Sequence, residues 1–155
     1  MQKSTKKPSI IISIPAYNEE RDIGPTLTGI KEVMKVTSYN YKILVLDDGS
    51  KDNTVRIAQE QGAIVVSHRR NKGLAETFRS EMKECLERKA DIIVHTDADG
   101  QYDPGQIPLL IKKVQEGYDF VLGSRFRGRI RHMPFTKRFG NILFSKVLSS
   151  LSKIR

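Results

Sequence analysis

The stretch Ala90–Pro104, ADIIVHTDADGQYDP, decides how the rest of the chain is interpreted. Its first half is an apolar run rich in β-branched residues, which is typical of a buried parallel strand. Asp97 and Asp99 follow directly, so we expect both carboxylates at the carboxyl edge of a sheet, where open α/β sheets bind their ligands. Two carboxylates this close repel each other, and a divalent cation with oxygen ligands would relieve that repulsion.

The same stretch has two other interpretations. A polar turn whose aspartates only cap the next helix fits the spacing equally well, so this alternative stays open. A calcium-binding EF-hand does not fit, because that loop needs glycine at its sixth position and glutamate at its twelfth. Counting from Asp97, these positions hold Tyr102 and Pro108.

Size and composition favour one globular domain without a membrane span. The 155 residues are enough to bury a core, and no apolar run reaches the ~18 residues of a membrane helix. The early apolar run Ile10–Ile14 is too short for a signal peptide, so we expect a cytosolic protein. The single Cys85 lies in a helical pattern and is expected to be a packed thiol.

The net charge of +9 comes entirely from the end of the chain. Residues 120–155 contain nine Lys and Arg and no Asp or Glu, whereas the first 119 residues are balanced. A neutral body with a basic end predicts a polyanionic partner: a lipid phosphate, an anionic membrane surface or nucleic acid. We do not expect nucleic acid, because no nucleic-acid-binding motif accompanies the basic residues.

Apolar strand patterns alternate with helical patterns along the chain. We expect strands at 9–14, 41–46, 64–67, 92–96 and 119–123, and helices at 25–36, 53–61, 74–88 and 104–115. This alternation predicts an α/β fold, a mostly parallel sheet flanked by helices, with the site loops at one edge. The helix at 74–88 is expected to present an apolar stripe formed by Leu74, Phe78, Met82, Cys85 and Leu86.

Several polar residues have simpler structural interpretations. Asp52 is expected to cap the helix at 53–61, and Asp103 the helix that begins at Pro104. His95 lies inside a strand and is expected in the core, whereas His68 and His132 are expected on surface loops.

The last segment, 125–155, differs from the rest. It begins as a basic loop in which Arg127, Arg129 and Arg131 alternate. The apolar residues that follow recur at helical spacing, and they are Phe139, Ile142, Leu143, Val147, Leu148 and Leu151. This helix either lies on a membrane surface or covers the sheet. Residues 125–155 are therefore expected to form a basic loop and an amphipathic helix of the same domain.

Five motifs, in this order and across nearly the whole chain, resemble glycosyltransferase family 2. Within it they are most similar to dolichol-phosphate mannosyltransferases and other polyprenyl-phosphate glycosyltransferases. The motifs are PAYNE at 15–19, VLDDGS at 45–50 with Asp52 and Thr54, NKGL at 71–74, DADGQ at 97–101 and GSRF at 123–126. The G-x-G-x-x-G and P-loop signatures of other nucleotide-binding folds are absent from the sequence.

The resemblance implies a Rossmann-like glycosyltransferase A fold and a role for each matched residue. It implies that 1–124 bind a nucleotide sugar and that 125–155 form the acceptor part of the same domain. Pro15, Tyr17, Glu19 and the Asp47–Asp48 pair would contact the base and ribose of a nucleotide sugar. Asp97, Ala98 and Asp99 would face its diphosphate, with Asp97, Asp99 and Gln101 around Mn²⁺ or Mg²⁺. The resemblance also implies that Asp99 and Arg125 are catalytic, and that Arg125, Lys137 and Arg138 bind the acceptor phosphate.

A phosphate acceptor also agrees with the charges. Transfer to a hydroxyl needs a carboxylate base, but no Asp or Glu follows Asp119. A phosphate monoester is already anionic near neutral pH and needs only positive charge to hold it. The expected activity is therefore inverting, metal-dependent transfer of a hexose from GDP-mannose or a UDP-glucose type of donor to a polyprenyl or dolichyl phosphate. We expect it at the cytoplasmic face of a membrane.

Two departures from the family pattern leave an alternative open. Ala75 stands where relatives often have a second glycine, and the sequence ends at Arg155, where relatives usually continue with more acceptor-binding structure. The acceptor part therefore looks shortened, and three interpretations stay open: a minimal enzyme, a truncated enzyme, or an enzyme that relies on a membrane-protein partner. The alternative function is a truncated or inactive glycosyltransferase-like protein that binds a sugar nucleotide or docks a partner.

Overall fold

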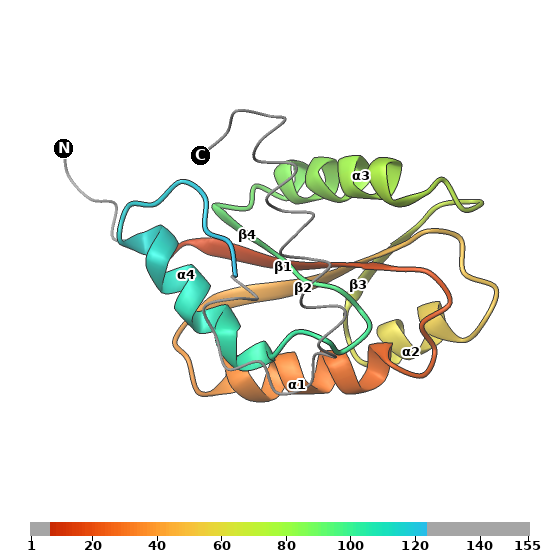
Figure 1. The fold of residues 1–155 in the computed structure, drawn as a ribbon, viewed down its shortest axis with the longest axis horizontal. Coiled ribbons are helices and arrows are strands. Elements are labelled where there is room, and N and C mark those ends of the chain that lie inside the picture. Colours follow the sequence, from red (N-terminus) through yellow and green to blue (C-terminus); the bar gives the residue numbers. More distant parts are fainter. Residues whose placement is uncertain (1–6, 124–155) are drawn as a thin grey trace, which may run out of the picture. The chain divides into compact units, whose positions relative to one another are not determined.

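A four-stranded parallel sheet forms the centre of the protein. The computed structural model describes residues 7–123, of which those up to Val121 form one compact unit, and Leu122 and Gly123 belong to a second. The strands are β1 (Ser9–Ala16), β2 (Asn40–Asp47), β3 (Ile64–Ser67) and β4 (Ile92–His95), in the order β3-β2-β1-β4. All three neighbouring pairs are parallel. The sequence prediction of a mostly parallel sheet is thus confirmed (Figure 1).

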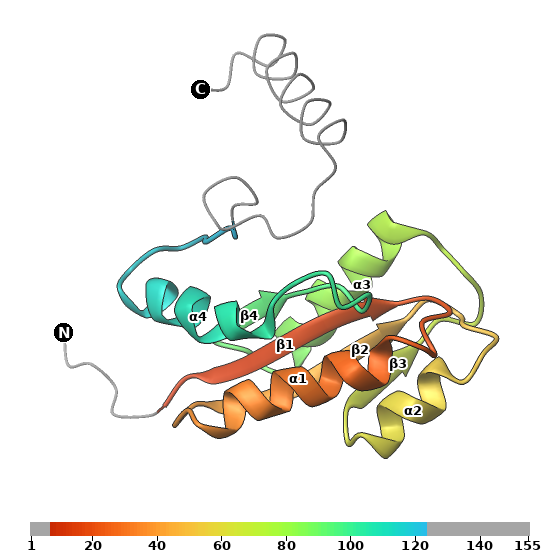
Figure 2. The same ribbon diagram turned by 60° about the horizontal axis from the view of Figure 1, so that its bottom comes forward.

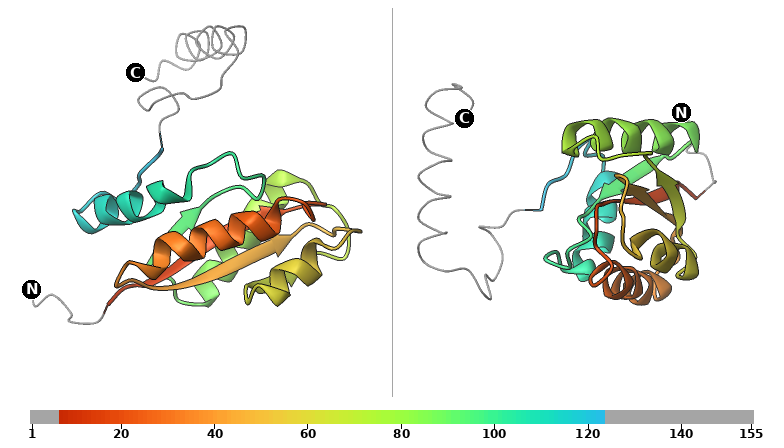
Figure 3. Two further views of the ribbon diagram at one scale, coloured as in Figure 1. Left: turned by 90° about the horizontal axis from the view of Figure 1, so that it is seen from below. Right: turned by 90° about the vertical axis from the view of Figure 1, so that its right-hand side faces the viewer.

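Helices cover both faces of this sheet. They are α1 (Ile23–Lys35), α2 (Thr54–Glu60), α3 (Leu74–Glu87), the 3-10 helix η1 (Pro104–Gln106) and α4 (Ile107–Gln115). Figures 1 and 3 show α3 alone on one face and α1, α2 and α4 on the other. No helix among residues 7–123 is both long and apolar enough to cross a membrane.

The central strand β1 separates two apolar layers. Its residues alternate, so Ile10, Ile12 and Ile14 pack in the larger core with α1, α2 and α4. Ile11 faces the other way and packs with Leu44 and the buried Cys85 in a smaller core beneath α3. Burial on both faces explains why β1 reads as a continuous apolar run rather than an alternating one.

Two predictions about the fold are wrong. Residues 119–123 form no strand, and Phe120 and Leu122 there are 76% and 75% exposed, so no element of residues 7–123 buries them as a neighbouring strand would. The buried positions of α3 are Thr77, Glu81 and Cys85 rather than the full apolar stripe, and Leu74 and Leu86 are exposed. The burial of Cys85 itself is confirmed.

Truncation of Ile12 to alanine tests the central position of β1. Ile12 is fully buried in the larger core, so Ile12→Ala should lower the free energy of unfolding by about 3 kcal/mol. Val36 is 88% exposed at the end of α1, and Val36→Ala serves as the control, with a change of at most about 0.5 kcal/mol. Urea denaturation measures both, and equal losses would contradict this account of the core.

Candidate functional site

Four loops meet at the carboxyl edge of the sheet. They follow β1, β2, β3 and β4 and comprise residues 17–22, 48–53, 68–73 and 96–103. Because the strands are parallel, their carboxyl ends point the same way, and Figure 2 shows the loops at the same end of the sheet. This is the edge at which the sequence predicts a ligand site.

The loops after β1 and β2 are joined by backbone-to-side-chain hydrogen bonds. The Asn18 amide donates to Ser50 Oγ at 2.8 Å, and the Lys51 amide donates to Asn18 Oδ1 at 2.9 Å. The Glu19 amide donates to Thr54 Oγ1 at 2.8 Å. These bonds fix the loop that carries Tyr17, which is 42% exposed beside them.

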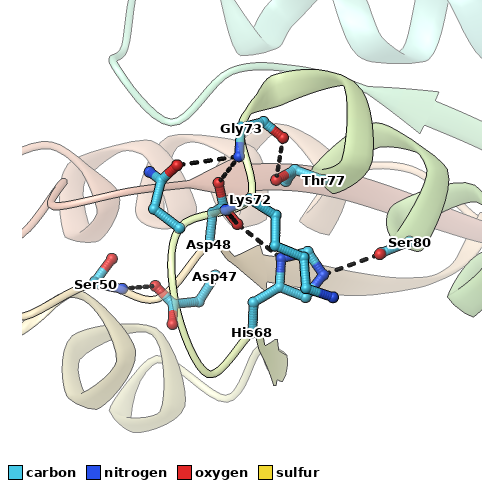
Figure 4. A network of polar contacts seen from close by, with 9 residues as sticks. Asp47, Asp48, Ser50, His68, Lys72, Gly73, Thr77 and Ser80 are labelled. Carbon is cyan, nitrogen blue, oxygen red and sulfur yellow. Dashed lines mark hydrogen bonds and ion pairs between the residues drawn. The ribbon is translucent and has the colours of Figure 1, made fainter.

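Both aspartates of the Asp47–Asp48 pair are buried, at 2% and 4% exposure. Asp47 Oδ1 accepts from the Ser50 amide at 3.0 Å and closes the turn after β2. Asp48 reaches across to the loop after β3. Its Oδ1 accepts from the Lys72 amide at 2.9 Å, and its Oδ2 accepts from the Gly73 amide at 2.9 Å (Figure 4).

His68 completes this network. Its Nδ1 donates to Asp48 Oδ1 at 2.7 Å, and its Nε2 lies 2.9 Å from Ser80 Oγ on α3 (Figure 4). The prediction that His68 lies on a loop surface is wrong, since its side chain is only 7% exposed. Burial alone would raise the pKa of Asp48, but hydrogen bonds from His68 and from the Lys72 and Gly73 amides outweigh it, so the pKa is lowered.

Gly49 allows the second and third loops to touch. It has φ +79°, in the left-handed region. A Cβ at this position would lie 2.7 Å from the Arg70 carbonyl carbon and 2.9 Å from the Asn71 nitrogen, both backbone atoms. Glycine is therefore required for two reasons here, its backbone conformation and the close approach of the Arg70–Asn71 peptide.

The loop after β4 is anchored to α1 by Thr26. The Thr26 hydroxyl donates to the Ala98 carbonyl at 2.9 Å, and Ala98 is buried at 3% exposure. The residues on either side are more accessible: the Asp97 side chain is 43% exposed, and Asp99 is half-buried, with Oδ1 accepting from the Gln101 amide at 3.0 Å. Ala98 is thus buried, while the carboxylates on either side of it remain accessible to solvent.

The carboxylates at this edge influence one another. The pKa of Glu19 is raised by its partial burial and by the negative charges of Asp22, Asp99, Asp52 and Asp97. A bound cation would offset this repulsion, and Asp97, Asp99 and Gln101 offer the oxygen ligands that Mg²⁺ and Mn²⁺ accept. Residues 7–123 contain no group of three His, Cys, Asp or Glu side chains placed to hold a metal, so ligand and water oxygens would complete the coordination.

His95 connects this loop to α3. The prediction that it is a core residue is wrong, because its side chain is 38% exposed. Its Nδ1 donates to Oε1 of the fully buried Glu81 at 3.0 Å, and its Nε2 lies 3.9 Å from Asp97 Oδ1. The hydrogen bond to Glu81 raises the pKa of His95, and Phe78 packs edge-on against the ring at 5.5 Å.

The capping prediction is confirmed for Asp103 and wrong for Asp52, which lies one residue before the cap position of α2. Asp52 Oδ1 accepts from the Thr54 amide at 3.0 Å, although Asn53 occupies the cap position of α2. Asp103 Oδ1 accepts from the Gly105 amide at 2.9 Å at the start of η1. Asp103 therefore serves the helix start, as expected.

The predicted acceptor residues lie outside the described part of the chain. They are Arg125, Lys137 and Arg138, together with the other basic residues and the amphipathic pattern of 125–155. Conversely, four residues of the described site were not predicted from the sequence to belong to it: Thr26, His68, Ser80 and Glu81. Only His68 carried a usable signal, because it directly follows a strand at the ligand-binding edge.

Comparison with known proteins shows which family and which relatives the sequence matches. Residues 11–147 match the model of the family described as glycosyl transferase family 2. The chain is 33% identical to a UDP-N-acetylglucosamine–dolichyl-phosphate N-acetylglucosaminyltransferase of Methanococcus voltae, over 86% of this chain and 59% of that protein. It is 32% identical to a dolichol-phosphate mannosyltransferase of Pyrococcus furiosus, over 94% of this chain and 42% of that protein.

Solved structures confirm the fold. The glucosyl-3-phosphoglycerate synthase of Mycobacterium tuberculosis, in complex with Mn²⁺, UDP-glucose and phosphoglyceric acid, superposes with a TM-score of 0.68. The two are 25% identical, over 93% of this chain and 50% of that one. The chain thus has the glycosyltransferase A fold, and it spans about half the length of these relatives.

Paired glycine substitutions test the contact at Gly49. Gly49→Ala should lower the free energy of unfolding by more than about 2 kcal/mol, since it adds a backbone clash to a strained φ. Gly62→Ala is the matched control: its φ is +73°, but its Cβ would meet nothing within 4 Å, so about 1 kcal/mol is expected. Equal losses in urea denaturation would show that the loops do not touch at Gly49.

Replacing Asp48 with asparagine gives a pH-dependent prediction. The pKa of Asp48 is lowered from 3.8 on folding, so its ionisation stabilises the protein above pH 3.8, and this contribution is lost as pH falls through the folded value. At pH 7 the free energy of unfolding of the wild type should exceed that of Asp48→Asn by about 2 kcal/mol. Denaturation at several pH values should show the difference closing below pH 4, and a constant difference would contradict the prediction.

Proposed function

Since the chain belongs to glycosyl transferase family 2, we propose that it transfers a hexose from a nucleotide sugar to a polyprenyl or dolichyl phosphate. The observation that carries the proposal is the loop after β4. There the Thr26 hydroxyl donates a hydrogen bond to the carbonyl of the buried Ala98. Asp97 and Asp99 are partly exposed on either side of Ala98, at the carboxyl edge of the sheet. This is where an open α/β sheet receives a ligand, and two carboxylates there favour a ligand that brings a cation.

The loops after β1 and β2 are proposed to border the base and ribose of the donor. Tyr17 and Glu19 belong to the first of these loops and Asp48 to the second, while Pro15 and Asp47 lie at the ends of the strands β1 and β2 that lead into them. The hydrogen bonds between Asn18, Ser50 and Lys51 hold the two loops together without a ligand, which supports a largely preformed donor site. A preformed site loses less conformational entropy when the nucleotide binds.

Asp97, Asp99 and Gln101 are proposed to hold Mn²⁺ or Mg²⁺ with the donor diphosphate. When bound, this cation would offset the negative charge that grows on the departing nucleoside diphosphate. The protein's own part is to orient the two carboxylates, which it does through the Thr26–Ala98 and Gln101–Asp99 hydrogen bonds. Crystals of the mycobacterial relative with Mn²⁺ and UDP-glucose support this assignment.

The acceptor is proposed to be a phosphate monoester of a polyprenyl or dolichyl lipid. Its anionic oxygen attacks the anomeric carbon, the bond to the nucleoside diphosphate breaks, and the configuration inverts by analogy with the family. The dolichyl-phosphate and dolichol-phosphate named for two relatives support the lipid. The proposed acceptor residues are Arg125, Lys137 and Arg138, of which Arg125 is also proposed to be catalytic. The basic segment would favour an anionic membrane surface at the cytoplasmic face.

Replacing Asp99 with asparagine tests this proposal. Asp99→Asn keeps an oxygen for the Gln101 amide but removes a charge, so we expect Mn²⁺-dependent transfer to fall about 100-fold or more. Asp103→Asn is the matched control in the same loop, because asparagine caps a helix about as well as aspartate. Thermal denaturation should show both variants folded.

The assay measures transfer from UDP-N-acetylglucosamine, UDP-glucose and GDP-mannose to a short polyprenyl phosphate in the presence of Mn²⁺. A second acceptor, 3-phosphoglycerate, covers the chemistry of the mycobacterial relative. Activity with 3-phosphoglycerate alone would overturn the lipid acceptor. Donor binding without transfer to either acceptor would favour a sugar-nucleotide-binding protein. Full activity of Asp99→Asn would overturn the metal site.

A further inference from the structure

Glu81 is a buried carboxylate on α3 that is only partly hydrogen-bonded. It is fully buried, on the same side of the helix as Cys85. Its Oε1 accepts from His95 Nδ1 at 3.0 Å, and its Oε2 has no hydrogen-bond partner among residues 7–123. Burying a carboxylate costs free energy, and an apolar side chain of similar size is often at least as stable in such a place. Stability alone therefore does not account for a glutamate at this position.

The hydrogen bond from Glu81 sets the orientation of the His95 ring. His95 is the last residue of β4, and Asp97 is the second residue after it. Because Nδ1 is bonded to Glu81 and Phe78 packs edge-on against the ring at 5.5 Å, rotation of the imidazole is restricted. The other ring nitrogen, Nε2, lies 3.9 Å from Asp97 Oδ1. Glu81 thus holds a nitrogen atom in place beside a carboxylate of the proposed donor site.

The carboxylates of Asp97 and Asp99 are held in different ways. Asp99 Oδ1 accepts from the Gln101 amide at 3.0 Å, so the turn of its own loop orients it. Within residues 7–123, Asp97 accepts no such backbone hydrogen bond, and its ion-pair partner is His95. A separation of 3.9 Å is too long for a direct hydrogen bond, but a small rotation of Asp97 or one bridging water would join the two groups. The orientation of Asp97 therefore depends on a ring that Glu81 holds.

We propose that Glu81 and His95 are a pair of positioning residues for Asp97. The pair limits the orientations of the Asp97 carboxylate before the donor and its cation bind, and it acts through Asp97 rather than by touching the donor. Removing the groups that orient metal-binding side chains typically weakens metal affinity about 10- to 100-fold. The inference rests on the proposed function, because it assumes that Asp97 receives a cation together with a nucleoside diphosphate.

Replacing Glu81 with leucine separates positioning from stability. Glu81→Leu removes the partner of His95 Nδ1 and fills the buried position with apolar atoms. We expect binding of Mn²⁺ in the presence of UDP or GDP, measured from the electron paramagnetic resonance signal of free Mn²⁺, to weaken about tenfold. The melting temperature should be unchanged or higher, whereas a merely structural pair would lower it and leave Mn²⁺ binding unchanged. Unchanged Mn²⁺ affinity would overturn the proposal.

Glu84→Leu is the matched control on the same helix. Glu84 pairs with Arg88 at 3.2 Å, and neither residue contacts the loop after β4. This variant should therefore bind Mn²⁺ with UDP or GDP as tightly as the wild type. An equal loss of affinity in Glu84→Leu and Glu81→Leu would overturn the proposal, because any lost charge on α3 would then have the same effect.

Two conservative variants divide the pair, and they decide the question if Glu81→Leu fails to fold. Glu81→Gln keeps an oxygen for His95 Nδ1, so most of the Mn²⁺ affinity should be retained. His95→Asn keeps a donor for Glu81 but has no atom in place of Nε2, so its Mn²⁺ affinity should fall about tenfold. The double variant Glu81→Leu/His95→Asn should bind no more weakly than the weaker single variant, since both changes break the same link. Wild-type affinity in His95→Asn would overturn the proposal.

Nuclear magnetic resonance of the metal-free protein distinguishes failure of the pair from failure of the proposed function. The Nδ1 proton of His95 should be protected by Glu81 in the wild type and exchange with water at least about tenfold faster in Glu81→Leu. Equal exchange rates would overturn the pair. A wild-type protein that binds no Mn²⁺ with either UDP or GDP would overturn the proposed function and the positioning role with it, while the exchange rate still decides whether Glu81 holds the His95 ring.

Discussion

The site depends on one constraint: four parallel strands end at a single edge, and the loops that leave them have little apolar surface to bury. Side chains of one loop therefore hold the backbone of the next. Asn18 and Ser50 join the first two loops, Asp48 joins the second to the third, and Thr26 ties the fourth to α1. Because an unpaired buried amide or carbonyl costs about 1 to 3 kcal/mol, these bonds make the edge a connected unit rather than separate loops.

The apolar pattern predicted the sheet well because burial on both faces leaves a clear signal. The run Ile10–Ile14 lies at the centre of the sheet, and the expected strands and helices up to Gln115 all formed, with ends that differ by a few residues at most. The expected strand at 119–123 shows the limit of this signal. Its residues have strand character, but a strand also needs a partner, and no local pattern records whether one is present.

Hydrogen bonds to residues distant in the sequence also explain why the predicted burial of His68 and His95 was wrong. His68 was expected outside and His95 inside, yet His68 is buried against Asp48, and His95 is partly exposed with its Nδ1 on Glu81. Each partner lies 14 or more residues away and on a different element. In α3, the buried Glu81 pairs with His95, and the buried Thr77 donates its hydroxyl to the Gly73 carbonyl, so an apolar stripe was a poor guide to the buried face.

The carboxylates of the edge divide according to what surrounds them. Asp47 and Asp48 are buried, and the chain's own amides neutralise them, so they stabilise the loops. Asp97 is more exposed, and the charges of Asp97 and Asp99 add to the effect of burial in raising the pKa of Glu19. Aspartates of identical chemistry thus differ in what they can still do. Where backbone donors satisfy the charge, the carboxylate also holds the loops of the edge in place, and where like charges persist at an accessible rim, the free energy of repulsion favours an incoming cation.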